Sequence, residues 1–240
     1  MRPVLFVRCD PLETFGIARD AVRDAGAEVR VWEAIEPDAE RPDLADVSGV
    51  VLFGSTYNVE HADEQPFIKD LRELTLEALD GGTPFLGVCF GAQVLAWALD
   101  AGVGKAPVRE VGFEPIHPTP AAASDELLSH HEDGDMGFQW HMDTFELPTG
   151  AELLVTGEGV QHQAYRVNAR TWGVQYHLEI DRPEIHDWLR AYARVGDLRS
   201  EWGKSDEQVL AEAGRHLADH EHRGRETFRR FVACARRAEG

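Results

Sequence analysis

Short apolar runs with no polar alternation recur through the early part of the chain and constrain its fold more than any other feature. Continuous apolar runs of this length are typical of strands buried on both faces of a parallel sheet. The runs are Val4–Arg8, Val29–Trp32, Gly49–Phe53 and Phe85–Val88. Stretches with helical character follow three of them, at Leu12–Ala25, Glu64–Leu79 and Ala92–Ala101. This repetition predicts an α/β fold, with an open, mostly parallel sheet and helices on both faces.

The second half of the chain is organised differently. Strands are expected at Pro107–Thr119, Glu152–Thr156, Gln163–Val167 and Thr171–Tyr176, with a loop and a short helix at Pro120–Gly137. The chain becomes helical after Asp181, and apolar residues keep helical spacing from Ser205 to Arg237. Gly224 is expected to divide that last stretch into two helices. Without a repeat or long linker, we expect an α/β domain over residues 1–196 and a helical C-terminal extension over 197–240 packed on it.

Charge and composition exclude several classes of function. The net charge of −19 argues against binding to nucleic acids or anionic membranes, because both need a basic surface. The apolar stretches are too short to cross a bilayer, and the N-terminal run is better explained as a strand than as a signal peptide. Three widely spaced cysteines, Cys9, Cys89 and Cys234, form neither a disulfide framework nor a paired metal-binding motif. We therefore expect a cytoplasmic protein.

The stretch Thr83–Gln93 carries the most specific chemical signal. A buried strand ends at Cys89, which Gly87 and Gly91 flank, and a helix begins at once. This is the sulfur counterpart of the Gly-x-Ser-x-Gly nucleophile elbow, in which a sharp turn exposes the central side chain. The helix N-terminus favours a thiolate, and the N–H of Phe90 is placed to stabilise an oxyanion. A lone cysteine is more often a small buried residue, but the two glycines and the immediate helix favour a nucleophile.

A thiol nucleophile needs a base, and the base needs a group that orients it. His177 follows another buried strand, at the end of the sheet where sites of α/β proteins gather. Glu179 lies two residues further and could bind one imidazole nitrogen while the other faces Cys89. The alternative is a structural histidine, which is the better interpretation of most lone histidines.

The complete set of motifs resembles the class I (triad) glutamine amidotransferases, and more narrowly the free-standing members related to the glutaminase domain of GMP synthetase. The resemblance covers about Val50 to Leu189. Its motifs are Gly54-Ser55, Gly87–Gln93, Glu110-Val111-Gly112, Gln139–Phe145 with Leu147-Pro148, and Gly173–Glu179. It implies a flavodoxin-like sheet of the class I glutamine amidotransferase type.

The resemblance also implies roles for individual residues. Cys89 would be the nucleophile, His177 the base and Glu179 the residue that orients it. The backbone N–H groups of Gly54 and Phe90 would form the oxyanion hole. Three further residues would bind the substrate: Gln93 in the glutamine pocket, and His141 and Asp143 in the segment that closes over the amino-acid end.

Three positions depart from the family pattern. Leu178 stands between His177 and Glu179 where a proline is usual, and leucine loosens a turn that proline would stiffen. Met142 replaces a common glycine, and Phe53-Gly54-Ser55 replaces a more usual Gly-Gly-Pro. The triad is intact, but these changes leave the substrate open.

The leading hypothesis is hydrolysis of a γ-glutamyl amide, glutamine to glutamate and ammonia, through a thioester on Cys89. No ATP-binding motif occurs in the chain, so an ammonia acceptor would belong to a separate synthetase subunit. A γ-glutamyl peptide hydrolase acting alone is the first alternative, which Met142 favours slightly. A binding or regulatory protein that lost turnover is the second. We expect no cofactor and no metal, and interpret the histidines at His130-His131 and His216, His220 and His222 as solvated polar stretches.

Overall fold

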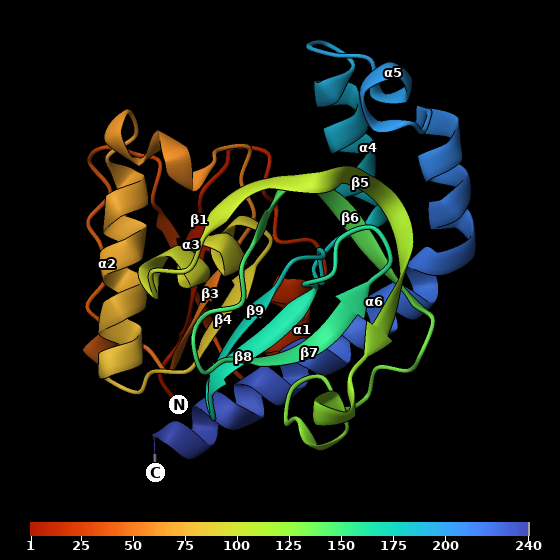
Figure 1. Ribbon diagram of the computed structural model, residues 1–240. Coiled ribbons are helices and arrows are strands. Elements are labelled where there is room, and N and C mark those ends of the chain that lie inside the picture. The colour runs from red at the N-terminus through yellow and green to blue at the C-terminus, as the bar shows by residue number, and fades with distance from the viewer. Residues whose placement is uncertain (240) are drawn as a thin grey trace.

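The computed structural model describes residues 1–239, whose strands form one mixed sheet (Figure 1). Five strands are mutually parallel: β1 Val4–Arg8, β2 Val29–Glu33, β3 Gly49–Leu52, β4 Phe85–Val88 and β9 Thr171–Val174. Antiparallel pairing extends the sheet through β5 Val103–Pro118, β6 Asp135–Phe145, β7 Glu152–Gly157 and β8 Ala164–Asn168. The strand order is β2-β1-β3-β4-β9-β8-β7-β5-β6. The predicted α/β fold is confirmed, and β9 joins its parallel and antiparallel parts.

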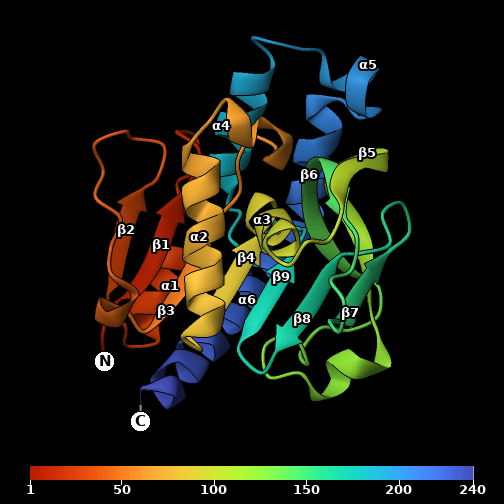
Figure 2. The same cartoon turned by 60° about the vertical axis from the view of Figure 1, so that its left-hand side comes forward.

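Helices cover both faces of the parallel strands, as Figures 1 and 2 show. Helices α1 (Ala18–Asp24) and α6 (Asp206–Ala238) pack on one face, and α2 (Phe67–Asp80) and α3 (Phe90–Ala98) on the other. Two further helices, α4 (Arg182–Tyr192) and α5 (Leu198–Trp202), pack with β5, β6 and the first half of α6. Short 3₁₀ helices lie at Leu44–Asp46, Val59–Asp63 and Pro120–Ser124.

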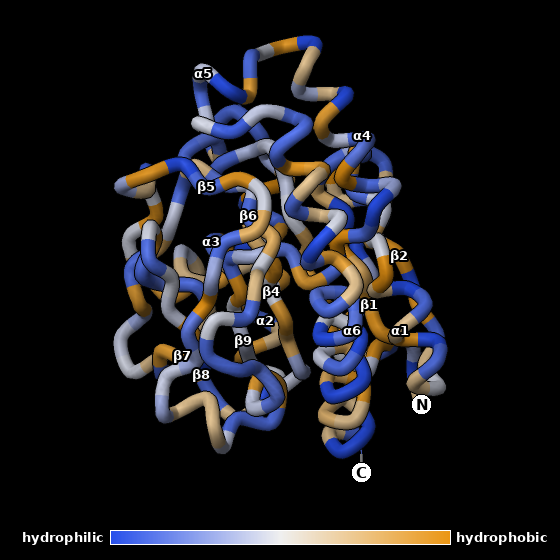
Figure 3. Tube along the Cα trace, turned by 90° about the vertical axis from the view of Figure 1, so that its right-hand side faces the viewer, coloured by the Kyte–Doolittle hydropathy of each residue, from blue (hydrophilic) through white to orange (hydrophobic). Residues whose placement is uncertain are grey.

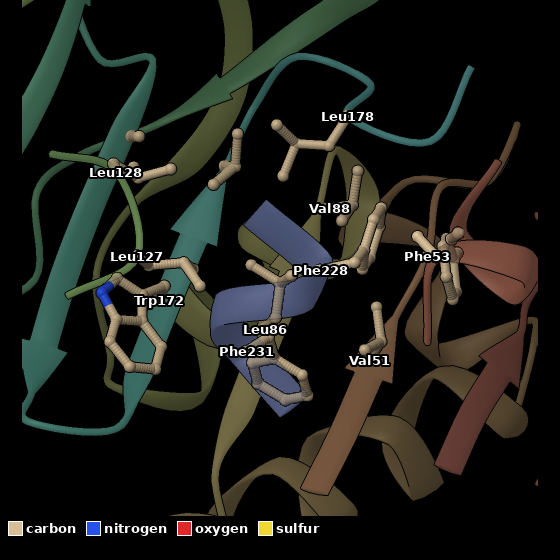
Figure 4. Close-up of a cluster of buried hydrophobic side chains, with 14 of the residues drawn as sticks. Val51, Phe53, Leu86, Val88, Leu127, Leu128, Trp172, Leu178, Phe228 and Phe231 are labelled. Atoms are coloured by element: carbon tan, nitrogen blue, oxygen red, sulfur yellow. The ribbon is translucent and has the colours of Figure 1, made fainter. Parts of the chain in front are cut away.

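The two-sided burial of the strands explains their continuous apolar sequences. Successive side chains on a strand point to opposite faces, so Phe6 packs toward α1 and α6 whereas Leu5 packs toward α2 and α3. Figure 4 shows the first of these cores, where Phe228 and Phe231 of α6 lie over Leu86 of β4. Both faces of the strand are thus apolar, and no polar alternation remains.

Helix α6 differs from the prediction because Gly224 does not divide it. A glycine inside a helix costs about 1 kcal/mol relative to alanine, yet a Cβ at Gly224 would lie 2.2 Å from the carbonyl oxygen of Leu178. Gly224 is therefore a point of close contact between α6 and the segment after β9. Hydrophilic and hydrophobic residues alternate along α6 in Figure 3, as expected for a helix with one buried side.

Two other elements differ from the expectations. The first helix begins at Ala18 instead of Leu12, because Phe15 and Gly16 have positive φ angles of 70° and 38°. These values interrupt a right-handed helix. Strand β6 was not predicted, and the part of it that begins at Asp135 lies inside the stretch expected to be a loop.

The segment before β1 and the end of α6 lie close together at one end of the sheet (Figures 1 and 2). The backbone N–H of Arg2 donates to Glu239 over 2.9 Å, which joins the first strand to the end of α6. Helices α5 and α6, at the positions of the predicted C-terminal extension, share apolar cores with the strands. Within residues 1–239, no helix combines the length and the apolar character that crossing a membrane requires.

Candidate functional site

Cys89 lies in a strained turn between β4 and α3. Its φ and ψ angles are 51° and −106°, a backbone conformation that is costly for a residue with a side chain. Neighbouring glycines make the turn possible. A Cβ on Gly91 would lie 2.0 Å from the carbonyl oxygen of Leu52, and one on Gly87 would lie 2.4 Å from the carbonyl oxygen of Gly91. Tight backbone packing therefore requires both glycines of the motif.

His177 and Glu179 lie in the segment that follows β9. Nδ1 of His177 is 2.7 Å from Oε1 of Glu179, and both side chains are buried. Burial would lower the pKa of His177, but electrostatic interactions with Cys89 and Glu179, with hydrogen bonds to both, raise it well above its ordinary value. The structure thus brings the three predicted triad residues together.

The loop after β3 approaches the same point. A Cβ on Gly54 would lie 2.9 Å from Cε1 of His177 and 3.7 Å from Cβ of Cys89. The amide of Phe90 is the first in α3 and has no helical carbonyl to bind. The Gly54 amide makes no hydrogen bond to another group of residues 1–239. Gly54 and Phe90 therefore both lie next to Cys89, and the oxyanion role of their N–H groups stays a prediction.

The three predicted substrate-binding residues surround this point but make internal hydrogen bonds. Nε2 of Gln93 donates to the carbonyl oxygen of Asp143 and to Gln175, each over 3.3 Å. The His141 ring contacts Glu110 at 3.0 Å, and the carboxylate of Asp143 pairs with Lys105 at 2.8 Å. Their side chains shape the wall of the site. A role in binding substrate stays a prediction.

A cavity of about 490 Å³ opens beside Cys89. Its lining comes from the loops that follow β1 and β3, from the start of α3, from β6, and from α4 and α5. The residues are Asp10, Leu12, Glu13, Gly54, Ser55, Thr56, Tyr57, Asn58, Cys89, Phe90, Gln93, Trp140, His141, Met142, Asp143, His177, Trp188, Ala191, Tyr192, Val195 and Trp202. The volume lies within the range of about 300–1,000 Å³ that is usual for small-molecule sites.

His220 on α6 supports the site from behind, and the sequence interpretation missed it. It was expected to be solvated but is 2% exposed, and His131 is also buried. Nε2 of His220 lies 2.7 Å from the carbonyl oxygen of His177. Burial lowers the pKa of His220 to about 4, so the ring is neutral near pH 7 and can donate its single N–H to that carbonyl. Both histidines are buried because α6 and the loop before β6 fold over the segment after β9.

Two more buried carboxyl groups lie near Glu179. Burial, followed by the charges of Glu184 and Glu179, raises the pKa of Glu13 well above its ordinary value. Burial and the charge of Glu179 raise the pKa of Glu184 to about 7. Glu184 also accepts hydrogen bonds from the backbone N–H and hydroxyl of Thr14. No local sequence pattern marked either residue, since the contact joins segments far apart in the chain.

In the part of the chain that the structure describes, no group of three or more histidine, cysteine or carboxylate side chains is arranged to hold a metal ion. The three cysteines are buried and unpaired within that part.

Comparisons with known proteins match the chain to one protein family. The family model described as glutamine amidotransferase class-I matches residues 16–190. A GMP synthase [glutamine-hydrolyzing] of Porphyromonas gingivalis is 34% identical over an alignment of 192 residues, which covers 72% of this chain and 36% of that protein. A glutamine amidotransferase-like protein, YfeJ, of Salmonella typhimurium is 28% identical over 184 residues, covering 73% of this chain and 75% of that protein. The chain thus spans about a third of the length of the GMP synthase.

Solved structures share the whole architecture. A glutamine amidotransferase from Thermotoga maritima superposes with a TM-score of 0.86 at 26% identity, covering 96% of this chain and 98% of the other. A glutamine amido transferase from Methylobacillus flagellatus has a TM-score of 0.87 at 23% identity, over 97% and 95% of the two chains, and shows the fold alone.

Proposed function

Because the chain belongs to the class-I glutamine amidotransferase family, we propose that it hydrolyses a γ-glutamyl amide through Cys89, His177 and Glu179. One observation carries the proposal. Backbone contacts that only glycine permits at Gly87 and Gly91 hold Cys89 in a strained turn beside the His177–Glu179 pair, at the wall of a cavity. Strain of this kind persists where the surrounding structure enforces it, and it is concentrated at functional sites.

The proposed reaction proceeds in two steps. The sulfur of Cys89 attacks the γ-carbonyl carbon and forms a C–S bond, and the N–H groups of Gly54 and Phe90 stabilise the oxyanion. His177 donates a proton to the leaving nitrogen, and the C–N bond breaks. Water, which loses a proton to His177, then attacks the thioester carbon, the C–S bond breaks, and glutamate leaves.

The electrostatics of His177 suit this role. Contact with Glu179 fixes which ring nitrogen faces the carboxylate and leaves the other for the thiol. The raised pKa of His177 favours the protonated ring, which is the proton donor that the leaving nitrogen needs.

Substitution of Cys89 tests the proposal directly. We expect Cys89→Ala to lower the release of glutamate from a γ-glutamyl amide by about 10⁴-fold or more, as for loss of a nucleophile elsewhere. Cys234→Ala is a matched control, because Cys234 is a buried cysteine on α6 that does not line the cavity. Equal rates for Cys89→Ala and the wild type would refute the mechanism.

A catalytically silent binding protein is distinguished by labelling. A glutamine-analogue diazo-ketone should alkylate Cys89 in the wild type and in Cys234→Ala. Failure of Cys89 to react would favour the silent alternative.

Two substrates remain within this chemistry. Free glutamine would deliver ammonia to a separate synthetase, in keeping with the name of the GMP synthase relative, of which the chain covers 36%. A larger γ-glutamyl amide would be cleaved by the chain alone. Met142 lies in the cavity wall, and the cavity extends beyond the thiol over α4 and α5, which favours the larger amide.

A further inference from the structure

One side of the cavity is an aromatic wall, formed by Trp140 of β6, Trp188 and Tyr192 of α4, and Trp202 of α5. The Trp140 ring lies 5.8 Å from the Trp188 ring, 6.1 Å from the Tyr192 ring and 6.3 Å from the Trp202 ring, in edge-to-face arrangements. The indole N–H of Trp202 donates to the hydroxyl of Tyr192 over 2.8 Å, so these two rings hold each other in place. The wall is a preformed apolar surface.

The aromatic wall begins at the predicted general acid. The Trp188 ring meets the His177 ring edge-to-face, with centroids 4.8 Å apart. In the proposed reaction His177 must reach the leaving nitrogen to protonate it. A substituent on that nitrogen therefore lies on the His177 side of the thiol, where Trp188 and then Tyr192 line the cavity.

The acidic residues of the lining already have partners inside the protein. Asp10 accepts from the backbone N–H groups of Leu12 and Thr56, each over 2.9 Å. Glu13 accepts from the N–H of Phe15 over 2.6 Å. The carboxylate of Asp143 is paired with Lys105, as described above. These carboxylates therefore offer little to a cationic amine.

The described residues that line the cavity include neither lysine nor arginine. The guanidinium of Arg109 lies 5.5 Å from the centroid of the Trp202 ring and pairs with Glu201. A leaving group that carried a carboxylate, such as an amino acid, would thus meet apolar rings and no cation of the lining.

We infer that the aromatic wall is a leaving-group subsite for an aralkylamine whose substituent carries no charge, so that the preferred substrate is a γ-glutamyl aralkylamide instead of glutamine. The inference rests on the proposed function and identifies its substrate class. An aromatic substituent would pack against Trp188 and Tyr192, because aromatic rings favour offset or edge contacts at these distances. Val195, 82% exposed at the same side of the cavity, extends the apolar surface outward.

Kinetics with matched amides test the inference. The substrates are glutamine, γ-glutamylmethylamide, γ-glutamylbenzylamide and γ-glutamylglycine, which differ only at the leaving amine. We expect kcat/KM for the benzylamide to exceed that for the methylamide and for γ-glutamylglycine by about tenfold or more, the scale at which apolar pockets discriminate.

A paired substitution on α4 locates the subsite. Ala191 lines the cavity, whereas Ala193, two residues on, is exposed and does not. Ala191→Glu places a charge in the apolar wall and should lower the ratio of kcat/KM for the benzylamide to kcat/KM for the methylamide about tenfold or more. Ala193→Glu makes the same chemical change outside the cavity and should leave all four rates unchanged. Val195→Asp, at an exposed position, serves as a second variant should Ala191→Glu unfold.

The outcomes separate the two proposals. Turnover of glutamine or the methylamide with no preference for the benzylamide overturns the subsite and leaves the proposed function intact. Unchanged benzylamide kinetics in folded Ala191→Glu and Val195→Asp also overturn it, and would assign the wall to a protein partner instead. Absence of turnover for all four amides, with an unreactive Cys89, overturns the proposed function itself.

Discussion

Adding one methyl group at Gly224 should disturb the site through the segment that carries His177. The new Cβ would lie 2.2 Å from the carbonyl oxygen of Leu178, whereas carbon–oxygen contacts in proteins are about 3.3 Å or longer. Helix α6 and the segment after β9 must therefore separate by about 1 Å. Overpacking of this kind costs about 1–3 kcal/mol.

A second glycine of the same helix supplies the control. A Cβ on Gly214 would meet no atom within 4 Å. Gly→Ala gains about 1 kcal/mol of helix propensity at either position, so this contribution cancels when the two variants are compared. The free energy of unfolding of Gly224→Ala should thus be about 1–3 kcal/mol below that of Gly214→Ala. Gly214→Ala itself should be about 1 kcal/mol more stable than the wild type.

Turnover of Gly224→Ala should also fall, because α6 binds the backbone of His177, the predicted base. His220 donates to the carbonyl oxygen of His177, one turn from the contact at Gly224. A displacement of about 1 Å can cost about 10²-fold in rate. Urea denaturation measures the stability difference, and hydrolysis of a γ-glutamyl amide measures the rate. Equal stabilisation by both substitutions, or equal turnover, would refute the close contact between α6 and Leu178.

Three further predictions concern pH, the strained turn and a helix cap. Glu184 has a pKa of about 7 in the folded protein and about 4.5 when unfolded, so the folded state binds more protons between these values. The free energy of unfolding should therefore fall by about 3 kcal/mol as pH rises through this interval. In Glu184→Gln, the difference between the free energies of unfolding at pH 5 and pH 8 should be much smaller than in the wild type. An equal difference in both proteins would contradict the assignment. Gly91→Ala would place Cβ 2.0 Å from a carbonyl oxygen of β3, so it should abolish turnover or folding, and near-normal activity would count against the strained turn. Ser205→Ala removes the side-chain cap of α6 and should cost about 1 kcal/mol in thermal unfolding, with turnover unchanged in the folded protein.

The parallel half of the sheet and the turn at Cys89 could be predicted from the sequence because their signals are local. A strand buried on both faces needs a continuous apolar run, and β1, β3 and β4 each have one. The turn at Cys89 needs glycines at fixed offsets, since the backbone of a neighbouring strand leaves no room for a Cβ. The pairing of His177 with Glu179 could also be predicted, because only Leu178 separates them in the sequence.

The other features of the fold and the site depend on contacts between residues that are far apart in the chain, and no local sequence pattern predicts such contacts. Gly224 resembled a helix break in the sequence, but it is the place where α6 touches Leu178. His220 resembled a solvated residue until α6 placed it against the backbone of His177. Trp140 and Trp188, from β6 and α4, form one wall only after folding. The sequence by itself thus determined the fold class and the candidate nucleophile, whereas the tertiary structure decided what supports His177 and what lines the cavity, because those contacts join residues that are far apart in the chain.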